Sequence, residues 1–156
     1  MPPLLEAYGY GGIFWDTSQV LGTLGIFALG NNTTTTNVYT YSGNTVVAGT
    51  ALATALEYGA AAGTSTLGVF ALGAGTTTTN VYTYSGNTVV AGTALTADVA
   101  YGAAAGTSTL GVFAIGNAIT TTNVYTYSGN TVVAGTALTT ALKYGAAAGN
   151  YNGGLA

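Results

Sequence analysis

The sequence contains no histidine and no cysteine. The chain therefore lacks the commonest general base, the thiol nucleophile and the two commonest zinc ligands, and it can form neither a serine–histidine–aspartate triad nor a disulfide. The acidic residues lie at unrelated positions of the repeat described below, so they predict neither the paired carboxylates of a glycosidase nor a calcium loop. We expect a protein that is not an enzyme, with no metal site and no cofactor.

Charged side chains are also nearly absent. One lysine and four acidic residues give a net charge of −3 over 156 residues, whereas about a quarter of the residues are charged in an ordinary soluble domain. A single cation cannot make the phosphate contacts that nucleic-acid binding and docking on anionic membranes require. We therefore expect neither nucleic acid nor a membrane surface as a partner.

Long apolar runs are missing as well. The most apolar segments, such as residues 67–72, are far shorter than the roughly 20 residues that cross a bilayer, so we expect no membrane insertion. Residues 1–6 have neither a basic region nor a sustained apolar core. They therefore do not predict an attached secretory signal.

What the sequence does contain is a repeat of 43 residues. The stretch TTTNVYTYSGNTVVAGTAL at residues 34–52 returns letter for letter at 77–95 and at 120–138. Identical copies predict one unit of architecture each. The chain then divides into an N-terminal arm or cap at 1–20, repeats at 21–63, 64–106 and 107–149, and a C-terminal tail at 150–156.

Each repeat contains four short stretches that predict β-strands. In the second repeat they cover residues 66–73, 79–84, 88–93 and 101–106. The first stretch is apolar on both faces, which favours a strand buried on both sides. Gly86 and Asn87 predict a tight hairpin turn with positive φ angles between the second and third strands. About one strand per 11 residues is the spacing of antiparallel all-β folds.

The order of these elements resembles the kelch-like repeat of β-propellers. The features that carry the resemblance are the strand GVFALG, the variable loop after it, the tyrosine-bearing strand and the tight turn, and together they cover residues 21–149. The resemblance implies that each repeat is a four-stranded antiparallel blade, and it implies little about function, because propellers serve many. A β-solenoid or a β-prism-like stack of the same units is the alternative.

Three blades are too few for a closed propeller, which has about four to eight. Proteins rarely tolerate raw sheet edges, so we expect homo-oligomerisation to complete the fold. A homodimer would form a six-bladed ring, and a longer ring or an open head-to-tail assembly would also join the ends. A solenoid would associate through its ends too.

Four residues are candidate oligomer contacts. Trp15 and Phe14, in the N-terminal arm, either plug the end of the core or dock onto a neighbouring subunit. Glu57 and Lys143 occupy the same position in different repeats. In a ring they would meet across a subunit boundary, where a surface ion pair contributes about 0 to 1 kcal/mol. Chance variation on a solvated face is the alternative.

Paired tyrosines beside an asparagine form the candidate ligand site. A tyrosine that stacks on a sugar ring, with asparagine bonding its hydroxyls, would create weak glycan sites that gain avidity from their number. In the alternative, one tyrosine of each pair packs between blades. The residues concerned are Tyr39, Tyr41, Tyr82, Tyr84, Tyr125 and Tyr127, with Asn37, Asn80 and Asn123.

The sequence favours a non-catalytic structural or assembly protein on an exposed surface, foremost a virion component such as a phage decoration, tail or fibre module. Trypsin has a single target bond, after Lys143, which suits the extracellular surface. The missing export signal favours release with a virion over secretion. Besides the chain itself, other virion or surface proteins are then expected partners. The alternative is a lectin-like propeller that binds glycans for attachment.

Overall fold

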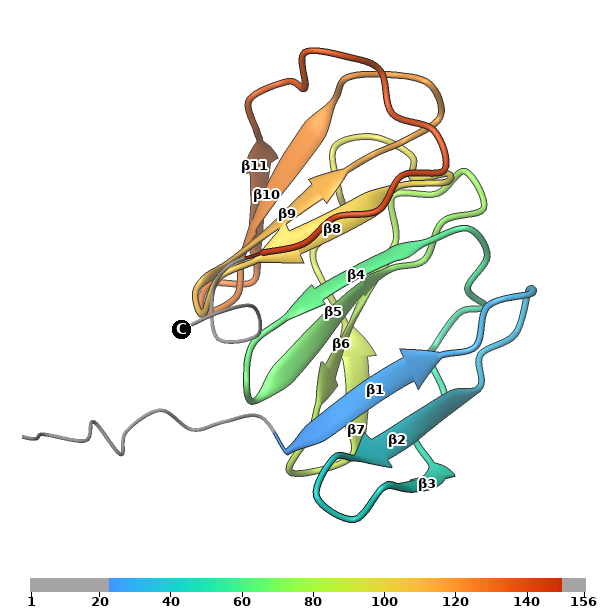
Figure 1. Ribbon diagram of the computed structural model, residues 1–156. Coiled ribbons are helices and arrows are strands. Elements are labelled where there is room, and N and C mark those ends of the chain that lie inside the picture. Colours follow the sequence, from blue (N-terminus) through green and yellow to red (C-terminus); the bar gives the residue numbers. More distant parts are fainter. Residues whose placement is uncertain (1–22, 150–156) are drawn as a thin grey trace, which may run out of the picture.

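The structure is a computed structural model that describes residues 23–149. Its regular elements there are eleven β-strands, and they form three antiparallel sheets that follow one another along the chain (Figure 1). The expected all-β antiparallel fold is confirmed. The strands are β1 Leu24–Ala28, β2 Thr36–Thr40, β3 Thr45–Ala48, β4 Ala60–Gly63, β5 Leu67–Ala71, β6 Thr79–Thr83, β7 Thr88–Ala91, β8 Ala103–Gly106, β9 Leu110–Ala114, β10 Thr122–Thr126 and β11 Thr131–Ala134.

The strands of each sheet lie in chain order. The first sheet has the order β1-β2-β3, the second β4-β5-β6-β7 and the third β8-β9-β10-β11. In Figure 1 the sheets form an open row, and β4 of the second sheet lies close to β8 of the third. Because each strand pairs with its neighbour in the sequence, the chain needs only short connections within a sheet.

The sheets are offset from the sequence repeats by one strand. β4 ends the first repeat, but it pairs with β5 of the second repeat, with Ala60 opposite Ala71 and Gly63 opposite Gly68. β8 pairs with β9 in the same register. Each boundary between repeats therefore falls inside a sheet, where backbone hydrogen bonds join one repeat to the next.

The fourth predicted strand forms in two copies out of three. Residues 146–149 have the same sequence as β4 and β8, yet they are not a strand, so the prediction is wrong there. The physical reason is that no fourth sheet follows to supply their pairing partner among the described residues. The two strands that do form begin at Ala60 and Ala103, two residues later than expected, because Tyr58 and Tyr101 have positive φ angles of 55° and 58°.

The predicted hairpin between the second and third strands is confirmed, with a different turn. Thr83 pairs with Thr88, which leaves a loop of four residues, and only the asparagine takes a positive φ, 48° at Asn87. Asn44 and Asn130 do the same in the other copies. Asparagine tolerates this left-handed conformation better than most residues, which explains why glycine is not required there.

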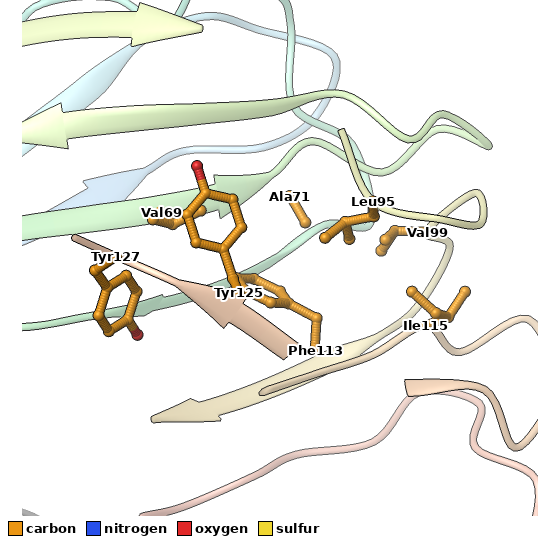
Figure 2. Close-up of a cluster of buried hydrophobic side chains, with 8 residues drawn as sticks. All are labelled: Val69, Ala71, Leu95, Val99, Phe113, Ile115, Tyr125 and Tyr127. Atoms are coloured by element: carbon orange, nitrogen blue, oxygen red, sulfur yellow. The ribbon is translucent and has the colours of Figure 1, made fainter. Parts of the chain in front are cut away.

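The apolar core lies between the sheets. One cluster joins the second sheet to the third and contains Val69, Phe113 and Tyr125 (Figure 2); the other joins the first sheet to the second and contains Phe70 and Tyr82. β5 is therefore buried on both faces, as predicted, because Val69 faces one cluster and Phe70 the other. The described residues cover only one face of β1 and one face of β9.

Candidate functional site

The two interfaces between sheets are built from the same residues in successive repeats, and each pairs two kinds of sheet face. We call the face that a sheet turns toward the next sheet its leading face. In the second sheet this face carries smaller apolar residues: Val69, Ala71, Leu95 and Val99. We call the opposite face, turned toward the preceding sheet, the trailing face. In the third sheet it carries larger side chains: Phe113, Ile115, Tyr125 and Tyr127.

Figure 2 shows this interface from the side, with the aromatic rings of the third sheet lying against the aliphatic side chains of the second. The interface between the first and second sheets repeats the arrangement 43 residues earlier. Its leading face carries Ile26, Ala28, Leu52 and Leu56, and its trailing face carries Phe70, Leu72, Tyr82 and Tyr84. The same contact between sheets therefore occurs twice in the chain, through equivalent residues.

A hydrogen-bond clamp fixes each interface at its outer end. The backbone N–H of Thr93 donates to Asn130 Oδ1 at 2.9 Å and to the hydroxyl oxygen of Tyr125 at 3.3 Å. The Thr93 hydroxyl donates to the Asn130 carbonyl, and the Tyr125 hydroxyl donates to Asn130 Oδ1. One threonine thus engages a tyrosine and a turn asparagine of the next sheet. The same bonds join Thr50 to Tyr82 and Asn87.

A second polar contact lies deeper in each interface. Asn123 is fully buried, and its Oδ1 accepts a hydrogen bond from the Thr96 backbone N–H at 2.6 Å. Its Nδ2 donates to the Thr122 carbonyl at 2.8 Å. Asn80 makes the matching bond to the Ala53 backbone N–H, at 2.8 Å. Both buried amides are satisfied, so they fix the sheets in one register and leave no unpaired donor or acceptor.

Glycine is required next to the clamp. A Cβ atom on Gly92 would lie 2.7 Å from the Tyr125 hydroxyl and would overlap Thr79 Oγ1. Gly49 is in the same position against Tyr82 and Thr36. The glycine therefore allows the backbone of one sheet to reach the tyrosine hydroxyl of the next.

A ladder of three tyrosines links the repeats on another side. The ring centroids of Tyr58 and Tyr101 lie 4.4 Å apart, and those of Tyr101 and Tyr144 lie 4.5 Å apart. The Tyr101 backbone N–H donates to the Tyr58 carbonyl at 2.9 Å, and the Tyr144 N–H donates to the Tyr101 carbonyl at 3.2 Å. We call these three residues the tyrosine ladder. They had been expected only as strand starts.

The two candidate charges lie at opposite ends of the tyrosine ladder. Glu57 lies beside Tyr58, and as hydrogen-bond partner and negative charge it raises the pKa of the Tyr58 hydroxyl above its usual value. Lys143 Nζ lies 5.1 Å from the ring centroid of Tyr144 and 5.7 Å from that of Tyr101, a cation–π contact. Within one chain Glu57 and Lys143 belong to different ends, and their meeting across a subunit boundary stays a prediction.

The candidate ligand residues differ sharply in exposure between copies. Tyr82 and Tyr125 are fully buried and their hydroxyls bond inside the protein. Asn80 and Asn123 are buried too. These four positions offer no ring face or amide to a sugar in this arrangement.

The first copy of the candidate ligand site is more open. Tyr41 is 58% exposed, and Tyr39 and Asn37 are half-buried. The equivalents of Tyr41 in the later copies are less exposed: Tyr84 is half-buried and Tyr127 is buried. Glycan binding by the paired tyrosines is still a prediction, and only the first copy presents an exposed ring for it.

Tyr127 is an exception among the buried polar groups. Its hydroxyl lies over Gly106 and Gly111 and has no hydrogen-bond partner within residues 23–149. Burial, with a smaller contribution from Tyr84, raises the pKa of Tyr127 to about 12. An unpartnered buried hydroxyl destabilises the fold, so this position is held for its shape and not for its polarity.

A cavity of about 600 Å³ opens between the start of β1, the end of β4 and the turn after β8. Phe27, Tyr41 and Tyr84 line it together with glycine, alanine and the hydroxyls of two turns, at Thr64, Ser65, Thr107 and Ser108. Among residues 23–149, the titratable side chains that line it are tyrosines. This lining suits a neutral polar ligand or further protein.

Trp15 and Phe14 lie outside the described residues. Within residues 23–149 no three acidic side chains come close enough to hold a metal ion, and this part of the chain has no helix long and apolar enough to cross a membrane.

Sequence reasoning missed the clamp threonines and the role of the turn asparagines. A signal was present: the third strand ends in Ala-Gly-Thr in every repeat. A glycine in a strand often marks a place where another backbone approaches closely. The approach crosses to the next sheet, which local sequence does not reveal.

No family model matches this chain, and no curated protein matches it.

Proposed function

We propose that this chain is a non-catalytic structural protein that works by assembling with copies of itself. The observation that carries the proposal is that the invariant tyrosine, asparagine and threonine side chains are used for contacts between sheets, as in the bonds of Tyr125, Asn130 and Thr93. In a binding protein or an enzyme, the repeated polar residues would instead converge on a solvent-filled site.

We further propose that the sheets are kelch-like propeller blades. Three features support this: antiparallel strands in chain order, packing through both sheet faces, and a strand from one repeat that completes the sheet of the next. A solenoid would stack its repeats along continuous sheets. Separate meandering sheets such as these favour blades.

The proposed setting is the surface of a virion, with an extracellular surface as the wider class. Support comes from the chemistry of the chain: five charges, a single trypsin target and repeated contact surfaces. The other components of such a particle are its expected partners. A gold-labelled antiserum against the purified chain tests this on particles released from the producing cells. Labelled particles are the expected result, and label confined to the cytoplasm would contradict it.

Assembly itself is tested by the solution mass of the purified chain across a range of concentrations. A multiple of the chain mass is expected. A monomer at every concentration would contradict the proposed function, because the chain would then not bind copies of itself.

One observation favours a lectin-like attachment protein as the second candidate. The exposed Tyr41 ring stands at the mouth of the cavity, whose hydroxyl-rich lining suits a sugar. A glycan array with the wild type and with Tyr41→Ala tests it, with Tyr144→Ala as the control for an exposed tyrosine outside the cavity. Binding that survives Tyr41→Ala would remove the proposed site.

A further inference from the structure

The trailing face of the first sheet has no partner among the described residues, although it has the sequence of a packed face. Phe27 is 53% exposed, whereas its equivalents Phe70 and Phe113 are 4% and 0% exposed. Leu29 is likewise exposed where Leu72 is buried. The first sheet therefore presents the aromatic half of an interface that is covered in both later sheets.

The leading face of the third sheet is the complementary case. Val112 is 41% exposed where Val69 is fully buried, and Leu138 is 38% exposed where Leu95 is 4%. The last described sheet thus presents the aliphatic half of the same interface. The two open faces of one chain are the two halves of a contact that the chain already makes twice.

The backbone edges match as well. The first sheet has three strands where the others have four, so the outer edge of β1 is unpaired among the described strands. Residues 146–149 have the sequence of β4 and β8 but no strand to pair with. By the register of the other sheets, Ala146 would lie opposite Ala28, and Gly149 opposite Gly25.

The clamp residues are also in place on both sides. Tyr39 already donates to Asn44 Oδ1, as Tyr82 does to Asn87. Thr136 is the repeat equivalent of Thr93, and the described residues give its backbone N–H no acceptor from a following sheet. Thr136 of one chain can therefore donate to Tyr39 and Asn44 of another in the geometry of the existing clamps.

Charge complementarity points the same way. A contact with the geometry of the internal ones would extend the tyrosine ladder from Tyr144 of one chain to Tyr58 of the next. Lys143 and Glu57, which flank those two tyrosines, would then be neighbours of opposite sign.

We propose that the leading face of the third sheet binds the trailing face of the first sheet of a second copy, with residues 146–149 adding the missing fourth strand to β1. This inference rests on the proposed function of self-assembly and names its surface. The contact is heterologous, so it closes into a ring or propagates. A closed propeller has about four to eight blades. Because each chain supplies three sheets, only a ring of six blades falls in this range, and this predicts a closed dimer with two identical contacts.

The first test compares solution masses of the full chain and of point variants. Phe27→Glu and Val112→Glu each place a carboxylate on one open face that is exposed in the single chain, so each variant is expected to fold and to be monomeric. Val90→Glu is the matched control, because Val90 is 58% exposed on β7 of a sheet that is already covered on both faces. It is expected to stay a dimer.

Mixing the two monomeric variants separates a heterologous contact from a symmetric one. Each variant retains the face that the other has lost, so an equimolar mixture is expected to form a dimer through a single contact, more weakly than the wild type. A dimer that withstands both substitutions would overturn this inference and leave self-assembly standing. A wild-type monomer at every concentration would overturn both.

The strand register is tested by cysteine pairs in a chain that has none of its own. Ala28→Cys with Ala146→Cys is expected to give an oxidised covalent dimer. Ala60→Cys with Ala71→Cys is the matched control, because that pair lies opposite within one sheet and is expected to close inside a single chain. A series of longer covalent products from the first pair would indicate an open filament in place of a closed ring, and would overturn the proposed dimer.

Discussion

The backbone N–H of Thr93 donates to Asn130 Oδ1 at 2.9 Å across the boundary between two sheets. The two residues are 37 positions apart in the chain. The turn asparagines Asn87 and Asn130 therefore have two tasks: each takes the positive φ of its own turn, and each anchors the preceding sheet. The consequences of these tasks can be measured separately.

Asn130→Gly is expected to lower the free energy of unfolding by about 1–2 kcal/mol, because glycine accepts the positive φ but the two hydrogen bonds that Asn130 Oδ1 accepts, from the Thr93 N–H and the Tyr125 hydroxyl, are lost. Asn44→Gly is the matched control, since Asn44 has the same φ and no preceding sheet among the described residues. Urea unfolding in the Phe27→Glu background excludes any contribution from association. Equal losses in the two variants would contradict the clamp.

Gly92→Ala is expected to destabilise the fold by about 1–3 kcal/mol, because the new methyl group overlaps the Tyr125 hydroxyl and Thr79 Oγ1. Gly86→Ala is the control. A Cβ there would meet only Thr88, at 3.4 Å or more, and the residue has no positive φ. Thermal unfolding of the two variants in parallel gives the comparison, and a Gly92→Ala protein as stable as the wild type would contradict the close packing at this glycine.

The free energy of unfolding is expected to fall at high pH because of Tyr127. Its pKa is raised from 10.0 to about 12 in the folded chain, so the unfolded chain loses this proton first and becomes favoured as the pH rises from about 10 to 12. Below pH 10 the contribution is fully present. Unfolding by urea over that range, with tyrosinate absorbance as a second signal, measures it.

Tyr127→Phe is expected to flatten this pH dependence and to leave stability at neutral pH unchanged or slightly higher, because the hydroxyl that it removes is buried and unpartnered. Tyr41→Phe, at the exposed equivalent position, is the control for the loss of a tyrosine hydroxyl at neutral pH. A neutral-pH loss of more than about 1 kcal/mol in Tyr127→Phe would reveal a hydrogen bond for this hydroxyl.

Glu57→Lys is expected to weaken the proposed dimer, because two lysines would then flank the junction of neighbouring tyrosine ladders. A surface pair contributes about 0 to 1 kcal/mol and the closed dimer would contain two such pairs, so the dissociation constant is expected to rise by up to about 30-fold. The double variant Glu57→Lys, Lys143→Glu restores opposite signs and should recover the wild-type value. Sedimentation at low and high salt measures both, and the gap should narrow at high salt.

The strands and their pairing within repeats follow from local sequence. Alternation in the stretch around Tyr82, the β-branched run after it and the turn at Asn87 specify a hairpin wherever they occur. The offset of sheets from repeats does not follow, because the Ala-Ala-Ala-Gly segment is the same in all copies and its partner lies across a repeat boundary. Residues 146–149 illustrate the limit: identical letters form a strand only where a neighbouring edge exists.

The tyrosines and asparagines predicted as a ligand site lie in different surroundings in the three copies. Tyr39 and Tyr82 have identical flanking sequences, yet one is half-buried and the other fully buried. Burial here depends on whether a preceding sheet lies against the ring, which no property of the local sequence encodes. For the same reason Thr93 and Asn130, far apart in the chain, could not be paired in advance.

The one-strand offset between sheets and repeats makes the array modular in copy number. Duplicating or deleting a unit of 43 residues inside it adds or removes one whole sheet and one whole interface, and both terminal faces stay as they were. A gene of this kind can therefore change length by unequal recombination without inventing a new contact. Only the number of chains needed to close a ring would change.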